Sequence, residues 1–177
     1  MKIEDNFLVQ EEFDELQALI MGEEFAWYYK GHIDYEEQKN KFQFIHMFYG
    51  DYTYQSVFCE KLDPIFNKII PISILRIKAN LLTRTSNIKV NIFHVDPFTD
   101  MGEEKMKQWT TSIFYMNTNN GYTEFEDGTI VESVANRMVI FPANLKHRGT
   151  TCTDQQTRVV INFNYLSAPD PTTLRKP

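Results

Sequence analysis

The sequence has few cysteines and no long apolar segment. It contains two cysteines, Cys59 and Cys152, and they do not form a CxxC pair. This number and spacing argue against a disulfide framework and favour free thiols in a reducing compartment. No apolar run approaches the roughly 20 residues that span a bilayer, and the acidic start of the chain has no apolar signal-peptide core. We therefore expect a cytoplasmic protein with no membrane-spanning segment.

Basic residues are also scarce. The chain carries 18 Lys and Arg against 24 Asp and Glu, which gives a formal net charge of −6. The basic residues are scattered, whereas contacts to nucleic-acid phosphates require clustered Lys and Arg. We therefore expect no nucleic-acid partner.

Aromatic residues, in contrast, are abundant, with 14 Phe and 9 Tyr among 177 residues. Most of these rings must pack in a core, although a minority could line a cavity. The length is typical of one domain with a substantial core. No internal repeat or low-complexity segment divides the chain.

The pattern of apolar residues indicates helices first and strands afterwards. Helical spacing predicts a helix over 7–21 and a second, short helix over 58–69. We expect the aromatic-rich segment 25–58 between them to be irregular, with one or two strands laid over a sheet. Alternating or apolar runs bounded by turn residues predict the remaining strands: 74–81, 88–93, 110–117, 122–126, 129–132, 137–141 and 157–165. Such a sequence is typical of an antiparallel sandwich or barrel.

A metal site is indicated by residues 91–96 together with a distant histidine. Residues i and i+2 of a strand point to the same face, so His94 and Asp96 can reach one point in space. His147, which follows the strand at 137–141, would add a second imidazole. Two imidazoles and one carboxylate, with open positions opposite, form the ligand set of non-haem Fe(II) oxygenases.

Arg158 indicates an anionic ligand. It opens the apolar strand at 157–165, where burying an unpaired guanidinium would be costly. We therefore expect its partner to be an anion. A bound dicarboxylate would fit the two-pronged geometry of arginine.

These residues match the pattern of a known family. The order His94-x-Asp96, His147, Arg158 on a β-rich chain resembles the 2-oxoglutarate- and Fe(II)-dependent dioxygenases, and it is closest to their prolyl-4-hydroxylase-like branch. Three segments resemble that branch's strand ending in Tyr-Leu-Asn, its Gly-Gly-x-Thr-x-Phe strand and its apolar-Phe-Pro element: 112–117, 121–125 and 139–142. The likeness covers about residues 76 to 166.

The resemblance implies a role for each matching residue. The Fe(II) ligands would be His94, Asp96 and His147. Arg158 would pair with the distal carboxylate of the cosubstrate 2-oxoglutarate, to which Tyr115 would donate a hydrogen bond. Thr123 would line the same pocket. The partners would be 2-oxoglutarate, O₂ and a peptide or small-molecule substrate, of which an unactivated C–H bond would be hydroxylated.

The resemblance also implies the fold. We expect a mainly β (α+β) chain with a double-stranded β-helix, or jelly roll, and supporting N-terminal helices. Within one domain of 1–177, residues 1–72 would form the helical and aromatic-rich part, 73–166 the jelly-roll core and 167–177 a tail.

The sequence departs from the family at two places near the substrate. Tyr122 replaces the second glycine of the Gly-Gly pair, and the stretch 97–109 is longer than in compact members. These departures concern the identity of the substrate more than the chemistry. Three other functions stay open. One is the same chemistry on a free amino acid or small metabolite; another is a cupin-type metal protein that binds no 2-oxoglutarate. The third is a non-enzymatic binding or assembly module. His46, in an apolar run, is better explained as a packing residue, and His32 as a loop residue.

Overall fold

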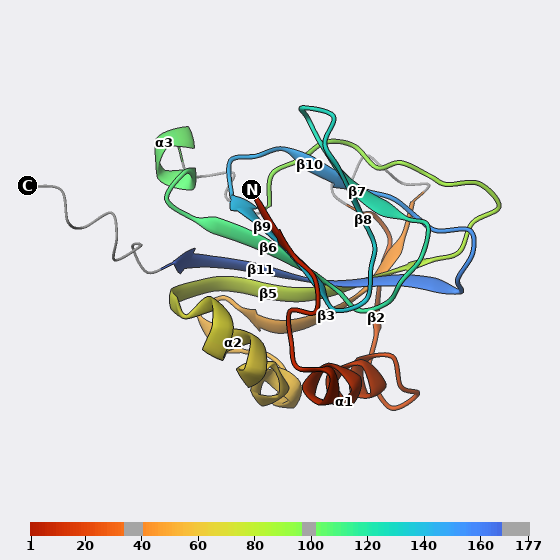
Figure 1. Ribbon diagram of the computed structural model, residues 1–177, viewed down its shortest axis with the longest axis horizontal. Coiled ribbons are helices and arrows are strands. Elements are labelled where there is room, and N and C mark those ends of the chain that lie inside the picture. Colours follow the sequence, from red (N-terminus) through yellow and green to blue (C-terminus); the bar gives the residue numbers. More distant parts are fainter. Residues whose placement is uncertain (34–40, 97–101, 168–177) are drawn as a thin grey trace, which may run out of the picture.

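The computed structural model describes residues 1–33, 41–96 and 102–167 (Figure 1). Part of the aromatic-rich segment, the start of the 97–109 stretch and nearly all of the expected tail lie outside these residues. In the part of the chain that is described, no helix is long and apolar enough to cross a membrane.

An eight-stranded antiparallel sheet forms the larger layer. Seven strands follow one another across it in a fixed order, and β4 (Thr53–Tyr54) pairs with β3 off this path. From one edge to the other these are β1 (Lys2–Glu4), β9 (Arg137–Pro142), β6 (Thr110–Tyr115), β11 (Thr157–Ser167), β5 (Pro71–Thr83), β3 (Gln43–Gly50) and β2 (Tyr28–Lys30).

A three-stranded antiparallel sheet lies over this layer (Figure 1). It consists of β10 (His147–Gly149), β7 (Tyr122–Phe125) and β8 (Ile130–Glu132). A buried apolar cluster joins residues of both sheets: Ile113, Tyr115, Phe125, Val131, Val139, Phe141 and Val160. Two facing antiparallel sheets confirm the predicted double-stranded β-helix.

Helices cover the opposite face of the larger sheet. Helix α1 (Gln10–Ile20) and helix α2 (Asp63–Ile69), which follows the 3₁₀ helix η1 (Val57–Leu62), lie below it in Figure 1, and the short α3 (Glu103–Met106) precedes β6. Helix α1 buries Phe13, Leu16 and Ile20, whose spacing places them on one side of the helix. Both helices at 7–21 and 58–69 are therefore confirmed within a few residues.

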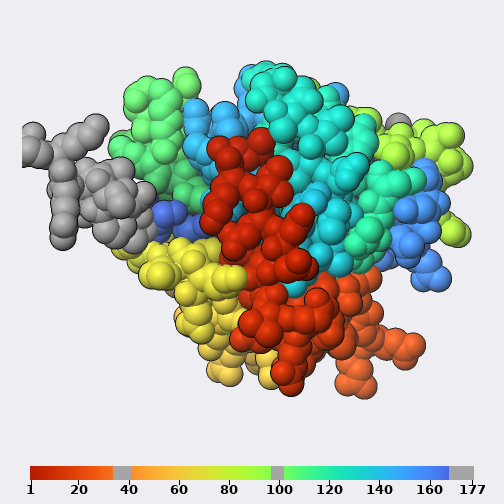
Figure 2. All heavy atoms as spheres, in the orientation of Figure 1, coloured from red at the N-terminus to blue at the C-terminus, as the bar shows by residue number. Residues whose placement is uncertain are grey.

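The N-terminal segment is fastened to the sheets by hydrogen bonds. Figure 2 shows it crossing the middle of one face of the molecule, between the segments around α2 and those of the later strands. Asn136 accepts from the backbone N–H of Leu8 at 2.8 Å and donates to the Leu8 carbonyl at 2.9 Å. Lys68 of α2 donates to the carbonyl of Phe7. The first eight residues are thus bound to the molecule, and β1 forms one edge of the larger sheet.

Two expectations for secondary structure were wrong. The described part of segment 25–58 contributes three strands, of which β3 is an inner strand paired with β2 and β5. Residues 88–93 do not form a regular strand. Val90 bridges to Thr150 and His94 bridges to His147. The distance from Val90 to His94 is four residues, whereas that from His147 to Thr150 is three. An extra residue of this kind interrupts the ladder as a β-bulge does.

The two central strands have one apolar face and one polar face. Ile77 and Ala79 of β5, with Val159 and Ile161 of β11, belong to the core beneath the helices. The alternate residues of the same strands face the cavity between the sheets: Arg76, Lys78, Asn80, Leu82, Arg158, Val160 and Asn162. Because side chains alternate along a strand, one sheet carries both the main core and a polar cavity floor.

The packing of α1 on the sheet yields a stability prediction. The ring of Phe13 is 3% exposed and meets that of Phe114 edge-on at 5.9 Å between centroids. Phe13→Ala should lower the free energy of unfolding by about 3–5 kcal/mol, because it leaves a cavity under the helix. Urea denaturation measures this change. Val9→Ala, at an exposed position just before the helix, should change it by less than about 0.5 kcal/mol; equal losses in both variants would contradict this packing.

A second prediction concerns His46, which lies in the core and not near the other histidines. Its Nδ1 is 2.7 Å from the Ala26 carbonyl, its Nε2 is 2.8 Å from the Ser56 hydroxyl, and burial lowers its pKa below the ordinary 6.5. The folded state thus favours the neutral ring. As the pH falls below 6.5, the histidine of the unfolded chain takes up a proton before that of the folded chain does, so the free energy of unfolding decreases.

The effect of His46→Gln should therefore depend on pH. The variant should be less stable than the wild type at about pH 7.5, and the gap should narrow at about pH 5.5. Chemical denaturation of both proteins at both pH values measures it. A gap that widens on acidification would show that the ring is charged in the folded state.

Candidate metal centre

The segment before Asp96 is held beside β10 by backbone hydrogen bonds. The N–H of His94 donates to the carbonyl of His147 and the N–H of His147 to that of His94, both at 3.0 Å. The N–H of Asn91 donates to Gly149 and that of Thr151 to Lys89, each also at 3.0 Å. This pairing places two histidines that are distant in sequence side by side, with ring centroids 4.7 Å apart.

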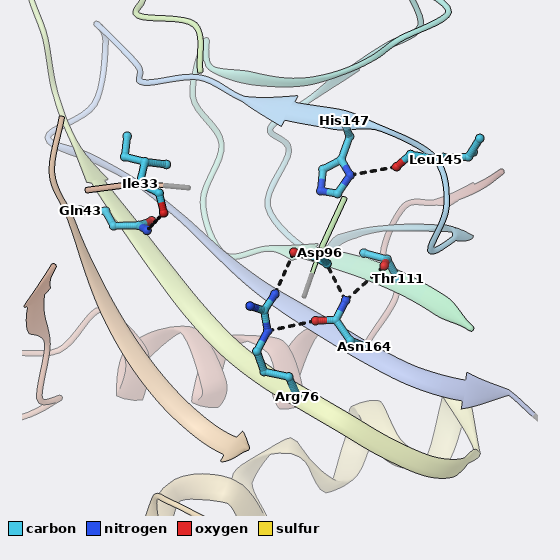
Figure 3. A network of polar contacts seen from close by, with 8 residues as sticks. All are labelled: Ile33, Gln43, Arg76, Asp96, Thr111, Leu145, His147 and Asn164. Atoms are coloured by element: carbon cyan, nitrogen blue, oxygen red, sulfur yellow. Dashed lines mark hydrogen bonds and ion pairs between the residues drawn. The ribbon is translucent and has the colours of Figure 1, made fainter. Parts of the chain in front are cut away.

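Three potential metal ligands converge there. One ligand atom from each of His94, Asp96 and His147 lies within 4.8 Å of the other two. The Nδ1 of His94 is 3.2 Å from the Ile92 carbonyl. The Nδ1 of His147 is 3.3 Å from the Leu145 carbonyl, as Figure 3 shows. With the proton on Nδ1, each Nε2 keeps its lone pair for a metal. The donor set therefore fits Fe(II) and leaves positions open for exchangeable ligands.

Both oxygens of the Asp96 carboxylate have partners in the larger sheet. Arg76 of β5 donates to Oδ1 at 2.8 Å, and Asn164 of β11 donates to Oδ2 at 2.9 Å (Figure 3). Arg76 also donates through Nε to Oδ1 of Asn164 at 3.1 Å, and the Asn164 amide donates to the hydroxyl of Thr111 at 3.1 Å. The orientation of the carboxylate is thus fixed by two strands that contribute no ligand.

The surroundings of Asp96 and His147 keep these two side chains in the protonation states that a metal needs. Burial alone would raise the pKa of Asp96, but the charge of Arg76, the two imidazoles and the hydrogen bond from Asn164 hold it well below its usual range. Burial lowers the pKa of His147 to about 4. At neutral pH the group therefore presents one carboxylate and neutral imidazole at His147, as metal binding requires.

Arg158 lies in the same cavity and is 4% exposed. Its Nε donates to the hydroxyl of Ser133 at 2.8 Å, and one terminal nitrogen donates to that of Thr123 at 3.1 Å. No carboxylate pairs with it among the residues that the structure describes. Burial lowers its pKa, but guanidinium groups stay charged in proteins. A buried cation with hydroxyl partners only is suited to an anionic ligand.

Tyr115 is fully buried behind Thr123. Its hydroxyl donates to that of Thr123 at 2.8 Å, and the guanidinium of Arg158 lies 5.6 Å from the centre of its ring. Burial raises the pKa of Tyr115, so its proton is available for this bond. The expected cosubstrate residues Arg158, Thr123 and Tyr115 therefore form one network, of which Thr123 and Arg158 reach the cavity.

The cavity has a volume of about 310 Å³, and most of the residues that line it are polar or charged. Besides His94, Asp96, His147 and Arg158 it is lined by Asn162, whose buried Oδ1 has no hydrogen-bond partner in residues 1–33, 41–96 and 102–167. A buried polar atom without a partner is costly, unless a ligand or water supplies the missing bond. Together with Arg158, this atom indicates that a polar molecule completes the cavity.

Several of these residues were missed by sequence reasoning. Arg76, Asn164, Ser133 and Asn162 belong to no recognised motif. A signal existed for Arg76, Asn162 and Asn164, because polar residues at alternate positions of apolar strands indicate a second face that is not core. Nothing in the sequence indicated that Ser133, which directly follows β8, would contact Arg158.

Comparisons with known proteins place this geometry in context. No protein-family model matches the sequence, and a search of curated proteins finds no relative. Solved structures do match. A prolyl hydroxylase from Trichoplax adhaerens, in complex with a peptide fragment of the hypoxia inducible factor oxygen degradation domain, has a TM-score of 0.63 and 13% identity, over 94% of this chain and 83% of that one.

Two further structures have similar scores. The non-haem α-ketoglutarate-dependent epimerase SnoN from nogalamycin biosynthesis gives a TM-score of 0.65 at 11% identity, over 94% of this chain and 78% of that one. A 2-oxoglutarate–Fe(II) oxygenase family protein from Burkholderia pseudomallei gives 0.59 at 12%, over 88% and 78%. The chain has the fold of the 2-oxoglutarate–Fe(II) oxygenases. The fold that the sequence resemblance implied is thereby confirmed, and the prolyl hydroxylase is one of the proteins that share it.

The contacts of Asp96 yield a prediction for metal affinity. Arg76→Gln should weaken Co(II) binding by about 10- to 100-fold, because partners that orient a ligand contribute on this scale. Absorption during a Co(II) titration measures the affinity. The matched control is Arg137→Gln, which breaks the ion pair of another strand arginine with Asp5 and should leave Co(II) affinity unchanged. Equal affinities in Arg76→Gln and wild type would contradict the orienting role.

Proposed function

We propose that this protein is an Fe(II)- and 2-oxoglutarate-dependent dioxygenase that hydroxylates an unactivated C–H bond. The observation that carries the proposal is the shared cavity. On one side lies the cluster of His94, Asp96 and His147, and on another lies the buried cation Arg158. A metal alone would explain the first group, but the second requires an anion as well. A metal-chelating dicarboxylate accounts for both.

Each residue has a distinct role in this proposal. His94, Asp96 and His147 hold Fe(II), while Arg76 and Asn164 fix the carboxylate. Arg158 pairs with the distal carboxylate of 2-oxoglutarate. The hydroxyl of Thr123 faces the same carboxylate, and Tyr115 joins this hydrogen-bond network beside it.

Iron and 2-oxoglutarate, when bound, supply the oxidative chemistry with O₂, in which 2-oxoglutarate is converted to succinate and CO₂. The protein binds and orients the reactants. The apolar side chains of Ile113, Leu82 and Val160 line the cavity between the polar groups and exclude water from part of it. Neutral imidazoles and one carboxylate leave the metal positions that two further ligands need.

The leading substrate is a prolyl or other residue of a peptide. This choice is supported by the similarity to a prolyl hydroxylase that was solved with a peptide. The same epimerase as above has also been solved with Fe³⁺, α-ketoglutarate and nogalamycin RO, so the fold accommodates small molecules too. A free amino acid or small metabolite is therefore the second candidate. We further propose a cytoplasmic location, since Cys59 and Cys152 are both free and buried.

The role of Arg158 separates this function from that of a cupin-type metal protein. Arg158→Gln should weaken 2-oxoglutarate binding to the Co(II)-loaded protein by at least about tenfold, because a hydrogen bond to a charged group contributes about 1.5–3 kcal/mol. Isothermal titration calorimetry measures it. The control is Arg84→Gln, an exposed residue just beyond the end of β5, which should bind 2-oxoglutarate normally.

The outcomes are distinct. If 2-oxoglutarate binds equally well to wild type and Arg158→Gln, it does not use this pocket. If wild type binds Co(II) but no 2-oxoglutarate, the cupin alternative replaces the oxygenase. If the wild type binds neither Co(II) nor 2-oxoglutarate, the remaining alternative is a non-enzymatic binding or assembly module.

A further inference from the structure

The cavity is strongly basic although the protein as a whole is acidic. Among the residues that the structure describes, the charged ones that line it are Asp96 and four cations, Lys30, Arg76, Lys78 and Arg158, in a chain with a formal net charge of −6. The proposed cofactors do not remove this imbalance, because the charge of Fe(II) and that of the dianion 2-oxoglutarate cancel. Even with Lys78 left out of the count, three cations against one carboxylate leave two positive charges. A site of this kind attracts a further anion.

Two of these cations already have partners in the proposed function. Arg76 is paired with Asp96 at 2.8 Å. Arg158 is held towards the smaller sheet by Ser133 and Thr123, where it would pair with 2-oxoglutarate. The amine of Lys30 has no hydrogen-bond or ion-pair partner among the described residues. It is half-buried.

Lys30 lies in a different part of the cavity from Arg158. It is on β2, in register with Gln43 of β3, and both side chains line the cavity. Strands β5 and β3 separate β2 from β11, so Lys30 and Arg158 are three strand spacings apart, about 14 Å along the sheet. A carboxylate bound between Arg158 and Thr123 therefore leaves Lys30 available to a second ligand.

Amide groups accompany Lys30 on this side. Asn80 of β5 is in register with Ile45 of β3 and lines the cavity, and its side-chain amide has no hydrogen-bond partner among the residues that are described. Gln43, beside Lys30, is anchored by its Nε2, which donates to the carbonyl of Ile33 at 2.8 Å (Figure 3). One ammonium group and a neighbouring carboxamide make a small polar subsite with a single full charge.

We propose that this part of the cavity, formed by Lys30, Gln43 and Asn80, binds a carboxylate of the molecule that is oxidised. The inference rests on the proposed function. A carboxylate fits because its single charge matches one lysine, and its second oxygen can accept from the Asn80 amide. The carboxylate holds the substrate at β2 and β3 and directs its other end towards the metal ligands. An acid is therefore selected over its neutral amide.

The test uses the protein loaded with Zn(II), which does not turn over, and saturated with 2-oxoglutarate. The free L-amino acids are titrated one at a time and compared with the corresponding L-amino acid amides by isothermal titration calorimetry. A second arm uses short peptides with a free or an amidated C-terminus. At least one acid should bind at least tenfold more tightly than its amide. The arm in which this preference is found distinguishes a small-molecule from a peptide source of the carboxylate.

Variants at Lys30 connect the preference to the subsite. Lys30→Gln should abolish it, Lys30→Arg should restore most of it, and Asn80→Ala should reduce it. Lys89→Gln, at an exposed position, should behave as wild type. All four should retain the wild-type affinity for 2-oxoglutarate, which also shows that they are folded.

Two results would overturn the inference. One is that no acid binds more tightly than its amide in either arm; the other is that Lys30→Gln retains the preference. If 2-oxoglutarate binds in these experiments and no carboxylate preference appears, only the subsite is wrong. If 2-oxoglutarate itself does not bind the Zn(II)-loaded protein, the proposed function is wrong, and the subsite that rests on it is wrong as well.

Discussion

The site depends on the pair of backbone hydrogen bonds that join His94 to His147. Both are 3.0 Å long and reciprocal, so neither residue can move along its segment without breaking the pairing of the other. They bring together ligands that are more than fifty positions apart, and they fix where Asp96 meets Arg76 and Asn164. Because the segment before Asp96 belongs to no regular strand, this bridge replaces the support that a continuous ladder would give.

The larger sheet also determines how charged groups are held inside this small protein. Strands β5 and β11 direct apolar residues to the core under α1 and α2, while their alternate residues direct cations and amides to the cavity. Desolvated charges are costly unless they are paired. Arg76 is paired with Asp96 within the protein, whereas Arg158 has only hydroxyl partners within the described part of the chain. Arg76 therefore has a structural role, whereas Arg158 is available to a ligand.

Much of this arrangement could be predicted from the sequence, and what could not has physical reasons. The helix at 10–20 and most strands follow from local periodicity, and the grouping of His94, Asp96 and His147 follows from motif order. The strand at 43–50 was not recognised as an inner strand, because its aromatic residues occupy both faces and leave no alternation of apolar and polar positions. The bulge between Val90 and His94 depends on the partner segment, and the contacts of Arg76 with Asp96 depend on the register of β5 against β11. Neither is encoded locally.

The most direct test of the account is an anaerobic titration of metal-free protein, first with Fe(II) and then with 2-oxoglutarate, followed by visible absorption. The account predicts a charge-transfer band that requires both additions and is absent from His94→Ala. His46→Gln, which changes a histidine outside the cavity, should retain the band. A band that persists in His94→Ala, or its absence from wild-type protein that has bound Fe(II), would contradict the claim that this cavity binds iron and 2-oxoglutarate together.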